Sequence, residues 1–129
     1  MAGTITVTHV PPVGRVGRIV FACTADAADG SFPDTTLPSF EGELVALATD
    51  PGATAPTANY DVTLVDSYGL DRLQGVGANR HTTNSEHANI VYSATSLHPQ
   101  VAHGETLTLN IDNSSVNSAT IAMTLFYRT

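Results

Sequence analysis

Apolar residues alternate with polar or small residues in short runs along most of the chain. A period of two residues is typical of strands that bury one face, whereas a helix repeats every 3.6 residues. In the run 105–111, Leu107, Leu109 and Ile111 fall on one face, and threonine and asparagine fall on the other. We predict strands for residues 4–10, 15–24, 42–49, 60–66, 70–74, 87–93, 105–111 and 118–127.

Helical patterns are nearly absent. No window of a dozen residues free of proline and glycine places apolar side chains three and four positions apart, so we expect at most one helical turn near residues 39–41. A chain of 129 residues can build one hydrophobic core but is short for two. The sequence therefore predicts an all-β fold: a single-domain antiparallel β-sandwich of jelly-roll or Greek-key type, spanning residues 1–129 with a short N-terminal segment.

Two details of the arrangement follow from the same pattern. The run 118–127 carries four large apolar side chains on one face, which predicts a central strand. The polar segments 66–69 and 113–117 are predicted to be tight reversals between neighbouring antiparallel strands.

The charged residues argue against nucleic-acid binding, and the absence of long apolar segments argues against a membrane protein. The chain has five arginines, no lysine and twelve carboxylates, which gives a formal net charge of −7. Nucleic-acid binding needs clustered cations, and only Arg15 and Arg18 lie close together, so we interpret this pair as a solvated edge. No segment has the length of a membrane span or the pattern of a secretory leader, so we expect a protein made in soluble form.

Cys23 is the only cysteine, which excludes an intrachain disulfide and a cysteine-rich zinc site. It lies in the apolar run 19–23, where a buried small side chain is far more common than a nucleophile. We therefore expect an inert thiol.

One acidic loop resembles a calcium-binding segment in composition. Asp26, Asp29 and Asp34 surround Gly30, but the EF-hand pattern requires an acidic residue at the twelfth position, where this sequence has Leu37. A solvated loop with turns closed by aspartate side chains is the preferred interpretation, and a weak calcium site of another kind is the alternative.

The histidines give a similar result for zinc. His81, Glu86 and His87 lie close together, but zinc hydrolases place two histidines and a glutamate on one helix, and this segment is loop and strand. We interpret the imidazoles as surface groups. The remaining histidines are His9, His98 and His103.

No motif for catalysis or for a cofactor is present. The sequence has no Gly-x-Ser-x-Gly elbow, and the glycine-rich segment 75–79 lacks the third glycine and the helix of a phosphate-binding loop. Exposed aromatic platforms, on which sugar or single-stranded nucleic acid would stack, are not evident either. We therefore predict a protein that is not an enzyme and that binds no metal or cofactor.

Much of the sequence resembles small virion proteins of tailed bacteriophages. The resemblance is carried by CTADAADGSFPDT at 23–35, PGATAP at 51–56, NYDVTLVD at 59–66, GLDRLQGVGANR at 69–80, by the segment 41–50 and by a predicted hairpin at 106–127. It implies a non-enzymatic virion component, and among these a capsid decoration or cement protein that stabilises the outer shell. A tail, connector or baseplate component is the alternative, and a carbohydrate-binding module is a third.

The resemblance also implies a partner and a location. Decoration proteins of this kind commonly sit as trimers on the capsid exterior, so we expect the major capsid protein as partner, a homotrimer, synthesis in the host cytoplasm, and no contact with nucleic acid or membrane. The loops 27–40 and 75–86 are long without carrying chemistry, which suggests that they make the contacts. The candidate contact residues are Phe32, Leu37, Val76, Asn79 and Arg80.

Overall fold

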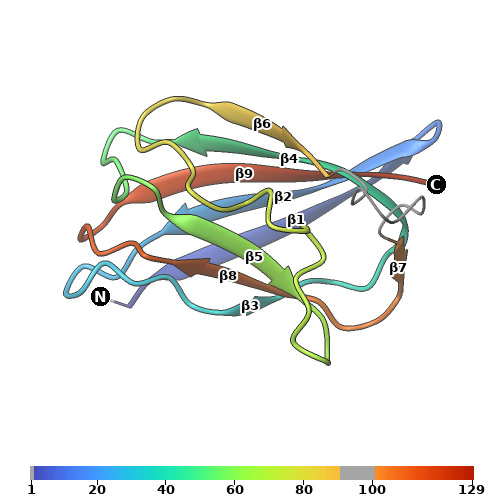
Figure 1. The fold of residues 1–129 in the computed structure, drawn as a ribbon, viewed down its shortest axis with the longest axis horizontal. Coiled ribbons are helices and arrows are strands. Elements are labelled where there is room, and N and C mark those ends of the chain that lie inside the picture. The colour runs from blue at the N-terminus through green and yellow to red at the C-terminus, as the bar shows by residue number, and fades with distance from the viewer. Residues whose placement is uncertain (1, 91–100) are drawn as a thin grey trace.

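The computed structural model describes residues 2–90 and 101–129, which fold into two antiparallel sheets packed face to face (Figure 1). The strands are β1 (Thr4–Val13), β2 (Val16–Thr24), β3 (Thr35–Thr36), β4 (Glu41–Pro51), β5 (Asp61–Val65), β6 (Glu86–Asn89), β7 (Val101–His103), β8 (Thr108–Asp112) and β9 (Thr120–Arg128). The larger sheet has the order β1-β2-β9-β4-β6, and β7 also pairs with β4. The smaller sheet has the order β3-β8-β5. These residues contain no helix, so the prediction of an antiparallel β-sandwich is confirmed.

The chain passes repeatedly from one sheet to the other. After the β1–β2 hairpin it forms β3 in the smaller sheet, β4 in the larger, β5 in the smaller and β6 in the larger. The last strand, β9, then enters the larger sheet between β2 and β4, so the prediction of a central C-terminal strand is confirmed.

The core lies between the two sheets and follows the predicted alternation. In β9 every second residue from Ile121 to Tyr127 is buried, and Val62 and Leu64 of β5 face them from the smaller sheet. Burying an apolar side chain of this size stabilises a fold by about 1.5 to 3 kcal/mol. Cys23 is also part of this core, and burial raises the pKa of its thiol to about 12, as expected for an unreactive cysteine.

The structure corrects three local predictions. Residues 70–74 form turns instead of a strand, because the Asp71 carboxylate accepts hydrogen bonds from the amides of Leu73 (2.9 Å) and Gly75 (3.0 Å). The segment 113–117 joins β8 to β9, which lie in different sheets, so it does not close a hairpin.

The third correction concerns the start of β4. The expected helical turn near residues 39–41 is replaced by extended chain, and β4 begins at Glu41. The strand predicted at 87–93 is present as β6, and the end of that prediction lies outside the described residues.

Candidate functional site

Two aspartates of the 26–34 loop, Asp26 and Asp29, hold the backbone of their own loop. Asp26 Oδ1 accepts a hydrogen bond from the Ala28 amide (2.6 Å), and Asp29 Oδ1 accepts from both the amide and the hydroxyl of Ser31 (2.9 and 2.7 Å). The bonds from Ser31 lower the pKa of the Asp29 carboxyl. Side chains of this kind close turns by replacing a backbone acceptor. Within residues 2–90 and 101–129, no three histidine, cysteine or acidic side chains lie close enough to share a metal ion.

The histidines of the described residues also have separate roles. His81 Nδ1 accepts a hydrogen bond from the Asn84 amide (2.8 Å), while the ring of His87 lies 6.0 Å from that of Phe126 on another strand. Glu86 accepts from the His81 amide, so its carboxylate organises the loop that leads into β6. His98 and the side chain of His103 lie outside the described part of the structure.

His9 corrects the interpretation of the imidazoles as surface groups. Its ring is partly buried on β1, where Nε2 lies 2.5 Å from Tyr127 Oη. The ring also lies 5.7 Å from the Tyr127 ring and 6.4 Å from that of Phe40. This histidine packs at the base of the hairpin because β1 turns its side chain towards the core side of the larger sheet.

Phe32 and Leu37 were predicted to contact a partner, but the structure buries both side chains within their own chain. Phe32 is 7% exposed and Leu37 is 6% exposed, and both belong to the core of the same chain. The Leu37 amide donates to the Leu107 carbonyl (2.9 Å), which fixes this segment along the smaller sheet. The core of the sandwich itself therefore buries these two apolar side chains.

The other predicted contact residues lie in or beside the loop 66–80. Val76 packs partly buried against the core, and Asn79 is exposed with a φ of 55°. Arg80 is partly buried, with its Nη1 3.6 Å from Glu86 Oε1 and with further hydrogen bonds to the Ala78 carbonyl. Of these three residues, only Asn79 has a largely exposed side chain.

The β1–β2 hairpin is a surface feature that was not predicted from the sequence. Gly14 and Arg15 form a two-residue loop between the paired residues Val13 and Val16, and Gly14 has a φ of 67°. A positive φ at the first loop position alone is typical of a type II′ hairpin turn. Figure 1 shows this hairpin extending at the end of the sandwich where the C terminus lies.

The hairpin tip exposes large apolar side chains. Val13 is 85% exposed and Val16 is 51% exposed. The register places Val10 of β1, Arg18 of β2 and Phe126 of β9 next to one another across the outer face of the larger sheet. These residues border a shallow hollow of about 310 Å³ beside the tip.

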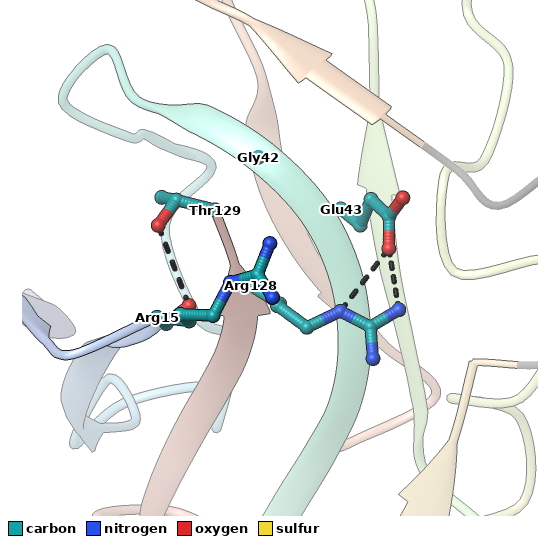
Figure 2. Close-up of a pocket in the computed structure, with 5 residues that line it drawn as sticks. All are labelled: Arg15, Gly42, Glu43, Arg128 and Thr129. Carbon is teal, nitrogen blue, oxygen red and sulfur yellow. Dashed lines mark hydrogen bonds and ion pairs between the residues drawn. The ribbon is translucent and has the colours of Figure 1, made fainter.

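A second hollow on the same end is polar and open (Figure 2). Its volume is about 460 Å³, and Arg128 Nη2 and Nε lie 2.5 and 3.2 Å from Glu43 Oε2. The Thr129 amide donates to the Arg15 carbonyl (2.8 Å), which ties the last residue of the chain to the hairpin turn. The Arg128 guanidinium and the Glu43 carboxylate form an ion pair in the lining of this hollow.

Charge is distributed unevenly along the chain. Residues 1–25 and 113–129 contain three arginines and no carboxylate, a formal charge of +3, whereas residues 26–112 contain two arginines and twelve carboxylates, a formal charge of −10. Together they give the net −7. Since the first two segments form β1, β2 and β9, these three adjacent strands carry no negative side chain.

Comparison with known proteins gives no relative. No protein-family model, no curated protein and no solved structure matches the chain. In the part of the chain that the structure describes, no helix has the length and hydropathy needed to cross a membrane.

Proposed function

We propose that this chain is a non-enzymatic structural component of a tailed-phage virion, and that it binds the outer capsid shell as a decoration protein. The sequence resemblance suggests this role, and the observation that supports it best is the exposed apolar hairpin. Solvent-exposed valines at a turn that extends from a rigid sandwich are typical of a surface that another protein covers.

The composition of the neighbouring strands supports binding by the same face. The outer sides of β1, β2 and β9 carry mainly threonine, alanine and valine together with Phe126, and their charged residues are Arg18 and Arg128. Protein interfaces are depleted of charged residues at their centre and enriched in arginine, which agrees with this pattern. The proposed partner is the major capsid protein, and the proposed assembly on the shell is a trimer.

Labelling of intact particles tests this role. Virions made by the phage that encodes this chain would be treated with an antibody against it and imaged by electron microscopy. We expect regularly spaced label over the shell, and a labelled tail tip would instead favour a tail or baseplate component. Absence of the protein from purified particles, measured by mass spectrometry, would contradict both.

A matched pair of variants tests the proposed surface. Val13→Ser with Val16→Ser should reduce recovery of the protein on shells that lack it, because it removes the apolar tip. Tyr68→Ser with Leu70→Ser is the control, since these side chains are 88% and 63% exposed at the tip of a different loop. Equal recovery of both variants on the shells would contradict binding through the hairpin tip.

A further inference from the structure

One edge of the larger sheet is long and lacks the usual protection. β1 lies at this edge and, among the described residues, pairs with β2 alone (Figure 1). An exposed edge presents unpaired backbone N–H and C=O groups, and proteins protect such edges with charged side chains, proline, bulges, short strands or a covering loop. Residues 4–10 contain no lysine, arginine, carboxylate, proline or glycine. Pro11, Pro12 and the shift of register come only after Val10.

The other edge strands are short or covered. β3, β7 and β6 have two, three and four residues. β5 is covered by the loop 66–80, because the Arg72 amide donates to the Leu64 carbonyl (2.7 Å) and the Val62 amide donates to the Gly77 carbonyl (2.8 Å). In the part of the chain that the structure describes, β1 is therefore the long edge strand with no backbone partner on its outer side.

The core is also incomplete beneath β1. Ile5 and Val7 point to the inner face of the sheet and pack against the core, but both are only partly buried. Their neighbours across β2, Cys23 and Phe21, are 3% and 1% exposed. A further strand outside β1 would cover Ile5 and Val7 in the way that β1 covers its neighbours.

We propose that β1 of one copy of this chain pairs with β1 of a second copy, antiparallel, around a twofold axis perpendicular to the sheet. A strand that fits this edge must be extended, must alternate apolar and polar side chains, and must offer unpaired backbone groups of its own. β1 itself has all three properties. Pairing centred on Val7 places residues 4–10 opposite residues 10–4 of the other copy and keeps the apolar side chains of both copies on one face.

The charge of the strands allows two copies to meet at this edge. Each copy has a net charge of −7, and all twelve carboxylates lie in residues 26–112. β1, β2 and β9, the three strands of each copy that lie closest to the proposed β1–β1 interface, contain none of them. Opposite like charges in paired strands are destabilising, and residues 4–10 bring no carboxylate, lysine or arginine to the pair.

The β1–β1 interface goes beyond the proposed function. That function assigns the hairpin tip and the outer face of the larger sheet to the shell, and the twofold axis leaves the outer faces of both copies on one side. A twofold contact doubles the mass of the unit that the chain forms, so it can also join two of the proposed trimers. One strand pair of seven residues is about 23 Å long and buries less than a standard interface, so we expect a Kd of about 10 to 100 µM.

Lysine at the interface tests the pairing. Thr6→Lys in both copies places two ammonium groups diagonally across the paired strands, with Cβ atoms about 7 Å apart. Ala122→Lys is the matched control, because Ala122 is exposed in the same row of the same outer face but lies two strands from the edge. In sedimentation velocity above the expected Kd, the parent and Ala122→Lys should double in mass, and Thr6→Lys should associate at least about tenfold more weakly.

Mixing opposite charges provides a rescue that an unfolded variant would not show. Thr6→Glu should weaken self-association for the same reason as Thr6→Lys. An equimolar mixture of the two variants should form mixed dimers, because lysine then meets glutamate across the interface. Failure to recover on mixing, or equal weakening by Ala122→Lys, would overturn the proposal.

Hydrogen exchange locates the contact in the full chain. Antiparallel pairing should slow the exchange of alternate amides in residues 4–10 of a concentrated sample relative to a dilute one, because alternate amides point away from β2. A mass that does not rise with concentration, or protection only outside β1, would overturn self-pairing. If Thr6→Lys but not Ala122→Lys lost binding to shells with no change in its mass, a strand of the capsid partner would occupy the edge instead. A chain that does not self-associate but is found on the shell would overturn this inference and leave the proposed function standing.

Discussion

Two protrusions expose large apolar side chains, and they are held in place by different forces. The β1–β2 hairpin continues the backbone ladder of the larger sheet, and its turn requires little more than Gly14. The loop 66–80 makes only isolated bridges and single backbone hydrogen bonds to the strand β5 and its start. The carboxylates of Asp66 and Asp71 add hydrogen bonds from backbone amides of the loop. The hairpin should therefore tolerate changes of side chain and of pH that would disturb the loop.

The largest expected difference in stability between the hairpin and the loop comes from a glycine-to-alanine substitution in each of them. A Cβ atom at Gly77 would lie 2.1 Å from the carbonyl oxygen of Val62, which is backbone and cannot turn away. Gly77→Ala should lower the free energy of unfolding by about 3 kcal/mol. Gly14→Ala meets nothing within 4 Å and should cost only about 1 kcal/mol, the strain of its positive φ. Urea denaturation measures both, and equal losses would contradict the comparison.

Removal of a carboxylate from the loop should have the next largest effect. Asp71 accepts hydrogen bonds from the amides of Leu64 (3.1 Å), Leu73 and Gly75, so it joins β5 to the loop. Asp71→Ala should destabilise the fold by about 2 kcal/mol, because hydrogen bonds to a charged acceptor are lost. Asp112→Ala is the matched control at an exposed carboxylate, and its effect should stay within about 0.5 kcal/mol. A similar loss of stability in both variants would show that the effect comes from the change in net charge.

Acid should loosen the loop before it affects the hairpin. Hydrogen bonds from backbone amides, that of Leu70 first, together with Arg72, lower the pKa of the Asp66 carboxyl. A carboxyl with a lowered folded pKa stabilises the fold above its unfolded value of about 3.9, and this contribution is lost as pH falls through the folded pKa. Amide NMR shifts around Tyr68 should therefore move at acid pH together with a fall in stability.

The hairpin provides the control for that titration. Residues 4–24 contain no carboxylate, so the amides of Val13 and Val16 should keep their shifts over the same pH range. Asp66→Asn should reduce the acid dependence of stability. An unchanged dependence would show that Asp66 does not contribute.

Whether the structure of a region could be predicted from the sequence depended on which interactions hold that region in place. Strands such as β9 could be predicted because their apolar and polar residues alternate, as expected for a strand that buries one face. The segment 70–74 holds only two apolar residues, Leu70 and Leu73, and is too short to show a clear period, so its sequence did not separate a strand from a turn. The three-dimensional position of the Asp71 carboxylate shows why the backbone turns. The local sequence does not show which backbone amides will lie within hydrogen-bonding distance of a side chain.

The candidate surface was harder to predict for a related reason. Phe32 and Leu37 lie in a polar loop, and nothing local indicates that this loop folds onto the core. The hairpin valines look like core residues in sequence, and they are exposed because the turn extends beyond the smaller sheet. The absence of carboxylates from residues 1–25 was the available signal, because it marks a region whose charge differs from that of the rest.

The smallest expected effect on stability comes from the hairpin valines, and it distinguishes their part in folding from their part in association. Val13→Ser with Val16→Ser should change the free energy of unfolding by no more than about 0.5 kcal/mol, because both side chains already contact solvent. Tyr68→Ser with Leu70→Ser should be equally mild for the same reason. Denaturation of dilute samples measures the folding term, and co-sedimentation with capsid shells measures association. Weakened association of the hairpin variant alone would distinguish the two protrusions by function, and an equal effect in both would show that exposure of apolar side chains alone drives association.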